Sequence, residues 1–148
     1  MVQISGGDKL EAKLAELARQ VGKPARLRVG FLENATYPDG KQVAMIAAIN
    51  EFGAPSRGIP PRPFFRNMVA AKRGEWSGAI AQLLQANGYD AGRTMGIVGQ
   101  VIAGQLRQSI RDTNAPPLAA STIARKGFAK PLIDTGHMYN SINHEVTG

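Results

Sequence analysis

The chain has 148 residues and a formal net charge of +7, with 43% hydrophobic and 20% charged residues. This length fits one domain with a modest core, and the composition is that of an ordinary globular protein. No apolar run approaches the roughly 20 residues that span a bilayer, so we expect no membrane contact. The lack of cysteine excludes disulfides, thiol catalysis and cysteine-ligated zinc.

The positive charge is concentrated in the first half of the chain. Residues 1–74 contain 12 Lys or Arg against 6 Asp or Glu, whereas residues 75–148 contain 6 against 5. Residues 52–73 contain five basic residues and no acidic one. This segment could bind a polyanion or an acidic neighbouring subunit, or it could be a solvated basic surface without a partner.

The first two predicted elements are an amphipathic helix and a strand. The helix covers residues 8–21 because Leu10, Leu14, Leu17 and Val21 recur at helical spacing. Asp8, with Glu11 three residues later, has the spacing of a capping box. Residues 25–33 then alternate between apolar and polar side chains, which predicts a strand with one buried face. The N-terminal residues do not resemble a signal peptide, so we expect a cytoplasmic protein.

A short second helix is predicted over residues 41–51. Asp39 and Gln42 can cap its N-terminus, and Gly53 can end it. Its buried stripe is predicted to comprise Val43, Ile46, Ala47, Ile49 and Asn50.

Two long helices follow. Pro63 suits the first turn of the first long helix, since its missing N–H would have no intrahelical partner there. The apolar pattern of this helix continues to Leu84, and Asn87 and Gly88 end the helix, although Gly74 and Gly78 weaken it by about 1 kcal/mol each. Asp90 is predicted to cap the second, whose apolar residues are Met95, Val98, Ile102, Leu106 and Ile110.

Four glycines lie within the second long helix: Gly92, Gly96, Gly99 and Gly104. A phosphate-binding loop needs its glycines between a strand and a helix, so this function is not indicated. Small residues allow two backbones to approach closely, and Gly92 and Gly96 share one helical face. We therefore expect close helix packing, within the chain or between subunits.

The C-terminal third contains shorter predicted elements. We expect a short helix over 121–126, an extended segment at 131–133, a helix over 135–141 capped by Asp134, and a final strand over 142–146. The residues expected to face the core are Leu132, Ile133, Met138 and Ile142. The predicted fold is α+β: a single small domain with four to five helices on a small, mostly antiparallel sheet that pairs distant segments.

No arrangement of residues indicates catalysis or a cofactor. The two histidines, His137 and His144, lack metal-ligand spacing and have no carboxylate cluster beside them. Ser121, Asp134 and His137 are the residue types of a hydrolase triad, but no G-x-S-x-G turn surrounds the serine. The sequence therefore indicates a protein that binds or assembles. A hydrolase remains only as a competing hypothesis.

Two stretches, residues 50–66 and 118–146, resemble the tail-completion and head-tail joining proteins of tailed bacteriophages, also described as virion morphogenesis proteins. In that family N-E-[FY]-G precedes I-P-x-R-P-F-[FL]-R and, later, T-x-x-x-K…K-P-L-[IV]-x-T-G-x-[LM]-x-x-S-I. The matching segments here are Asn50–Gly53, Ile59–Arg66 and Thr122–Ile142. The structural motif positions are Asn50, Glu51, Gly53, Pro63, Leu132, Asp134, Thr135, Gly136 and Ser141. The glycine-rich helix has no counterpart in the family pattern.

The resemblance implies a non-enzymatic structural protein of the virion neck, made in the host cytoplasm. Its partners would be further copies in a hexameric ring, the head connector, tail terminator or tube proteins, and genome DNA in passing. The loop before Phe64 contains four prolines, so it would lose little conformational entropy on docking. Candidate interface residues are Arg57, Ile59, Arg62, Phe64, Phe65 and Arg66, with at least one phenylalanine expected in the chain's own core.

The alternative function is a basic nucleic-acid-binding protein. A pI of about 10.1 and the basic residues from Arg57 to Arg73 favour it. Against it, the chain has 9 aromatic residues (1 Trp, 3 Tyr and 5 Phe), none alternating with basic residues in a strand as a stacking platform requires.

Overall fold

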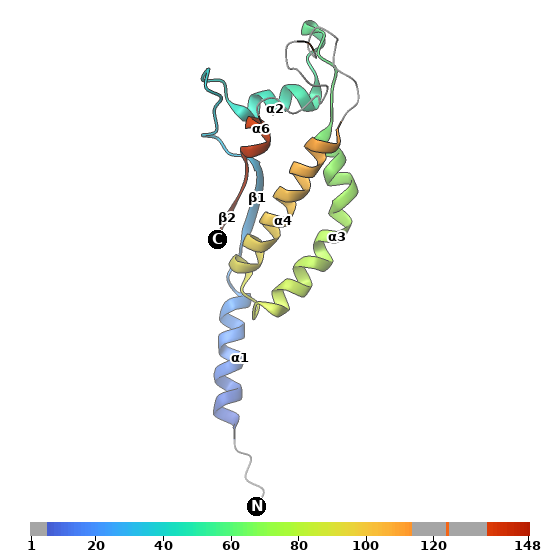
Figure 1. Cartoon of the computed structure of the whole chain (residues 1–148). Helices are drawn as coiled ribbons and strands as arrows, with labels where there is room; N and C mark the ends of the chain where they lie inside the picture. Colours follow the sequence, from blue (N-terminus) through green and yellow to red (C-terminus); the bar gives the residue numbers. More distant parts are fainter. Residues whose placement is uncertain (1–5, 114–123, 125–135) are drawn as a thin grey trace, which may run out of the picture.

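The computed structural model describes residues 6–113, 124 and 136–148. Its elements are α1 (Gly7–Val21), β1 (Arg26–Phe31), α2 (Val43–Phe52), the 3₁₀ helix η1 (Pro55–Arg57), α3 (Phe64–Ala86), α4 (Ala91–Asp112), α6 (His137–Asn140) and β2 (Ile142–Thr147). These five α-helices and two strands confirm the predicted α+β class and the single small domain. Figure 1 shows an elongated molecule in which α1 extends from one end of a body that has α2 at the other end.

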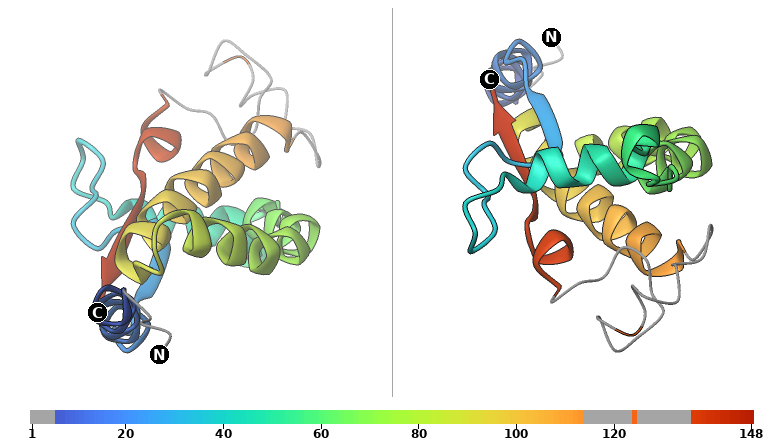
Figure 2. Two further views of the ribbon diagram at one scale, coloured as in Figure 1. Left: turned by 90° about the horizontal axis from the view of Figure 1, so that it is seen from below. Right: turned by 90° about the horizontal axis from the view of Figure 1, so that it is seen from above.

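The two strands form an antiparallel ribbon although more than a hundred residues separate them. Their register runs from Arg26 opposite Thr147 to Phe31 opposite Ile142. This confirms the prediction of a sheet that pairs distant segments. Helix α4 packs against both strands, and α3 packs against α4. Figure 2 shows α2 lying across the end of β1 and the start of α3.

The core lies where α4 meets the sheet, α3 and α2. Its buried apolar residues are Val43, Ala47, Phe64, Met68, Val98, Ile102, Ala103, Leu106, Ile110, Met138 and Ile142. Two polar contacts also join α3 to α4. Trp76 Nε1 donates a hydrogen bond to Gln105 Oε1 at 2.9 Å, and Ser109 Oγ donates to the carbonyl of Phe64 at 2.6 Å.

Within the chain, one of the glycines of α4 lies at a close contact. A Cβ atom at Gly99 would lie 2.5 Å from His144 Cδ2 and 2.8 Å from Leu27 Cδ1, so this glycine lets the helix approach the sheet closely. A Cβ at Gly96 or Gly104 would meet nothing within 4 Å. The close approach is therefore between α4 and the two strands. Of these three glycines, Gly99 is the one that faces the sheet.

Of the predicted N-terminal caps of α1, α2 and α4, Asp90 is confirmed as a side-chain cap and Asp8 and Asp39 are wrong. Gln42 occupies the predicted N-cap position of α2, but its side chain makes no capping hydrogen bond. The N-cap of α1 is Gly6, with φ 108° and no side-chain bond, and Asp8 lies in the first turn. The Asp39 carboxylate accepts the amide of Lys41 at 3.1 Å, a local turn that ends before α2 begins. Asp90 does cap α4, because its Oδ1 accepts the amide of Arg93 at 3.0 Å.

The C-terminal helix is shorter than predicted. Helix α6 begins at His137 and not at residue 135, because Gly136 is its N-cap with φ 73°. Met138 and Ile142 are buried as expected, and Ser141 Oγ donates to the carbonyl of His137 at 2.7 Å. The remaining predictions for this region lie outside the described residues, except that Ala124, within the helix predicted over 121–126, is helical. The others are Leu132, Ile133, Asp134 and Thr135.

A helix able to cross a membrane would need a long apolar run, and none of the helices in the described ranges has one.

Candidate subunit interface

The first turn of α3 is capped by Glu51, a residue of α2. Its carboxylate accepts the backbone amides of Phe65 at 2.8 Å and Arg66 at 3.1 Å. These amides belong to the turn of α3 in which N–H groups have no intrahelical acceptor. Pro63 occupies the N-cap position, one residue before the helix and not within its first turn, and it has no side-chain oxygen to cap with. Glu51 supplies that oxygen.

Arg66 completes the connection between α2 and α3. Its Nε donates to Glu51 Oε1 at 2.7 Å, and a terminal nitrogen donates to the Glu51 carbonyl at 3.2 Å. The guanidinium also lies 5.0 Å from the centre of the Phe52 ring, within the range of a cation–π contact. The Glu51 side chain is 6% exposed and that of Arg66 is 58% exposed. Arg66 therefore holds the loop against α2 while part of the Arg66 side chain faces solvent.

The loop between the helices is closed by its own backbone. Ala54 and Ile59 exchange two hydrogen bonds, at 2.8 and 3.1 Å, around the turn formed by η1. Gly53 has φ 74°, and a Cβ there would lie 2.8 Å from the carbonyl oxygen of Ile59. The amide of Arg62 donates to the Asn50 carbonyl at 2.7 Å. We call residues 50–66 with these contacts the α2–α3 clamp.

The interface candidates divide into two groups. Phe64 is 1% exposed and Arg62 is 5% exposed, so both belong to the chain's interior and neither can meet a neighbour in this conformation. Burial lowers the pKa of Arg62 below its ordinary value. Phe64 packs edge-on against Phe31, with ring centres 6.3 Å apart. The expectation that at least one phenylalanine packs in the core is therefore confirmed.

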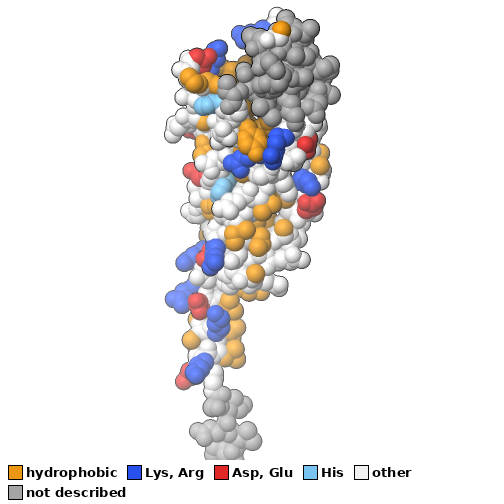
Figure 3. Space-filling model, in the orientation of Figure 1, with side chains coloured by type: hydrophobic (Ala, Val, Ile, Leu, Met, Phe, Trp, Pro, Cys, Tyr) orange, Lys and Arg blue, Asp and Glu red, His pale blue; other side chains and the backbone are white. Residues whose placement is uncertain are grey.

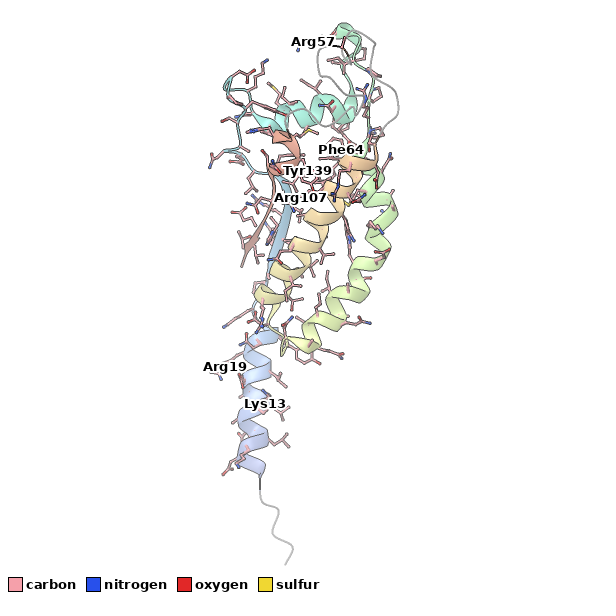
Figure 4. The ribbon with its side chains drawn as sticks, in the orientation of Figure 1. Lys13, Arg19, Arg57, Phe64, Arg107 and Tyr139 are labelled. Carbon is pink, nitrogen blue, oxygen red and sulfur yellow. The ribbon has the colours of Figure 1, made fainter. Side chains whose placement is uncertain are left out.

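The remaining candidates are partly or fully accessible. Arg57 and Arg66 are exposed, and Ile59 and Phe65 are half-buried. Figure 4 shows Arg57 at the tip of the loop, at the opposite end of the molecule from Lys13 and Arg19. The clamp therefore presents one arginine at its tip and a second beside α2.

Sequence reasoning missed the outer face of α2. Phe52 is 64% exposed and Met45 is 50% exposed, and Ala44 and Ala48 are exposed beside them. The only charged residue of α2 is Glu51, and its side chain faces inward. A helix that is apolar on all sides normally has partners on all sides. The unbroken apolar run VAMIAAI was the available signal.

A shallow hollow lies on this face. It has a volume of about 260 Å³, and the residues that border it include Ala44, Ala48, Phe52, Phe65 and Arg66. Its surface is apolar except at Glu51 and Arg66. Such a hollow can accept an aliphatic or aromatic side chain from another protein.

The described residues add no support for the hydrolase hypothesis. His137 Nε2 lies 2.6 Å from the carbonyl of Thr36, and its ring lies 4.7 Å from the Tyr37 ring. Both contacts hold the histidine against the segment before α2. Ser121 and Asp134 lie outside the described residues.

Comparison of the chain with known protein families, with curated protein sequences and with solved structures found no match.

Proposed function

We propose that this protein is a non-enzymatic structural subunit of the neck of a tailed-phage virion. In this proposal it forms a homo-oligomeric, hexameric ring that completes the tail or joins it to the head connector. Its other partners are tail terminator or tube proteins. The observation that carries the proposal is the α2–α3 clamp, which joins the two motif segments Asn50–Gly53 and Ile59–Arg66 into one hydrogen-bonded unit.

The clamp suits a docking role because its shape is fixed before a partner arrives. The closed loop and the Glu51 cap leave little backbone freedom to lose on binding. The accessible side chains at and beside it, including Arg57, Phe52 and Arg66, are of the types enriched at protein interfaces.

The alternative, nucleic-acid binding, is weakened by where the basic residues lie. Of those in residues 52–73, Arg62 is buried and Arg66 is bound to Glu51. Lys72 lies 3.5 Å from Glu75. Arg57 and Arg73 are exposed and form no ion pair with any described residue. Affinity for a polyanion grows with the number of phosphates that cations contact, so this segment offers few such contacts.

Charge reversal at Arg57 and at Arg73 separates these functions. Arg57→Glu should give folded protein that is not incorporated into virions, leaving heads and tails unjoined. Arg73→Glu makes the same change of charge away from the loop and should assemble normally. Replacing Arg62 or Arg66 would be uninformative because both are part of the fold. The measurements are the yield of complete particles in a phage lacking the native protein and the circular dichroism of each variant.

A DNA-binding function would give another pattern. Both variants would bind arbitrary duplex more weakly, and each would lower the slope of affinity against salt by about one unit. Normal particle yield with Arg57→Glu would contradict the assembly role of the loop.

A further inference from the structure

Helix α1 carries an apolar seam that no described residue of its own chain covers. Leu10, Leu14 and Val21 are 61%, 56% and 67% exposed, and no residue of α1 is buried. Figure 1 shows the helix extending from the body, and Figure 3 shows apolar side chains along one edge of this arm. With Leu17, the spacing of these residues is four, three and four, which gives a narrow seam of the kind that packs against another helix.

Among residues 6–113 and 136–148, a second exposed apolar surface is the outer face of α2. The exposed large hydrophobic residues in the described ranges are Leu10, Leu14, Val21, Met45, Phe52 and Val101. All but the last belong to α1 or α2. Isolated apolar residues on a surface need no explanation, whereas rows of them mark interaction sites. Both helices therefore present candidate interaction sites.

The two surfaces are complementary in shape and composition. The α1 seam is a ridge of branched aliphatic side chains, about 16 Å long at 1.5 Å per residue. The α2 face has a shallow, largely apolar hollow whose lining includes three alanines, Phe52 and Phe65. The seam covers only two heptads, and isolated helices of this length are marginal, so pairing with a second α1 would be weak. A preformed concave surface on a folded body is the better partner.

The position of the two helices decides which molecules are joined. Helix α1 and helix α2 lie at opposite ends of the elongated chain (Figure 1), so the ridge cannot reach the hollow of its own subunit. We propose that the seam of α1 docks on the outer face of α2 in a second copy of this chain. Each copy then contributes its α1 to one neighbour and binds the α1 of another on its α2 face. Such a head-to-tail contact closes into a ring or continues as a filament.

This inference rests on one part of the proposed function, that the chain assembles with itself. It adds which two surfaces form the contact between copies. It can be tested on the purified protein because the chain has no cysteine of its own. Ala18→Cys lies beside the seam, Ala12→Cys lies on the opposite side of α1, and Ala48→Cys lies in the hollow. All three alanines are exposed, so the substitutions should leave the fold intact.

The experiment mixes an Ala48→Cys chain with a chain of different mass that carries either α1 cysteine, and then oxidises the mixture. We expect a disulfide between Ala18→Cys and Ala48→Cys chains, and little or none when Ala12→Cys replaces Ala18→Cys. Leu14→Glu in the chain that carries Ala18→Cys should abolish the product, because a charge would enter the apolar contact. Native mass spectrometry of Leu14→Glu alone should show loss of the oligomer.

Other outcomes would overturn the proposal. Disulfides between two Ala18→Cys chains in preference to the mixed pair would show that arms pair with arms. Disulfides between two Ala48→Cys chains would show that α2 faces pair. A monomer that forms no intermolecular disulfide would remove the contact altogether. Incorporation into virions is measured separately: a protein that enters virions without the mixed disulfide contradicts only this contact, and one that forms it but never enters virions contradicts only the virion role.

Discussion

Arg66 Nε lies 2.7 Å from the carboxylate of Glu51, and the amide of Arg66 donates to the same carboxylate oxygen at 3.1 Å. One side chain of α2 thus orders both the backbone and the side chain at the start of α3. The loop that carries the candidate interface is held between these two helices, so its stability should depend on this contact.

Glu51→Ala should destabilise the protein by about 2 kcal/mol, because it removes a helix cap and a charge-assisted hydrogen bond. The measurement is urea unfolding followed by circular dichroism. Glu75→Ala is the matched control, since Glu75 pairs with Lys72 on the exposed side of α3 and should cost less than about 1 kcal/mol. Equal losses for the two variants would show that Glu51 is not a cap of α3 in solution.

Gly53→Ala should destabilise the protein by about 2 kcal/mol or more, since a Cβ at φ 74° would also press on the Ile59 carbonyl and the Pro61 nitrogen at 2.8 Å. Gly74→Ala, within α3 and with nothing within 4 Å of the new Cβ, should instead stabilise it by about 0.5–1 kcal/mol. Thermal unfolding of both variants gives the comparison. If the two substitutions change the unfolding temperature in the same direction, the proposed loop geometry is wrong.

Gly99→Ala should cost about 1–3 kcal/mol, because α4 would have to move away from His144 and Leu27. Gly96→Ala in the same helix meets no atom within 4 Å and should be neutral or stabilising in the isolated chain. Guanidinium unfolding of both variants tests how closely α4 approaches the sheet. A harmless Gly99→Ala would argue against that approach.

Asp39 should titrate below its ordinary pKa of 3.8, chiefly because its carboxylate accepts the backbone amide of Lys41 and then because it bonds the Lys41 ammonium. A lowered folded pKa means that this contact stabilises the protein above pH 3.8 and is lost as pH falls through the folded value. Carboxyl NMR titration measures it. Lys41→Ala retains the backbone amide and should keep most of the lowering, so full return to 3.8 in that variant would refute the assigned order of causes.

The sequence determined the elements whose formation depends on near neighbours. Apolar spacing of three and four residues predicted α1, α3 and α4, and alternation predicted β1, because helices and strands bury residues with these periods. The Asp90 cap was also predictable, since donor and acceptor are three residues apart. Where a local turn competed, as at Asp39, the same reasoning gave the wrong cap.

The tertiary structure decided what distant segments do to each other. Glu51 caps a helix that begins 13 residues later, Gly99 admits side chains of both strands, and Arg62 is buried while Phe52 is exposed. None of these follows from a residue's type or from its near neighbours in the chain. Each depends on how α2, α3, α4 and the sheet are placed relative to one another, and packing of the whole chain sets that placement.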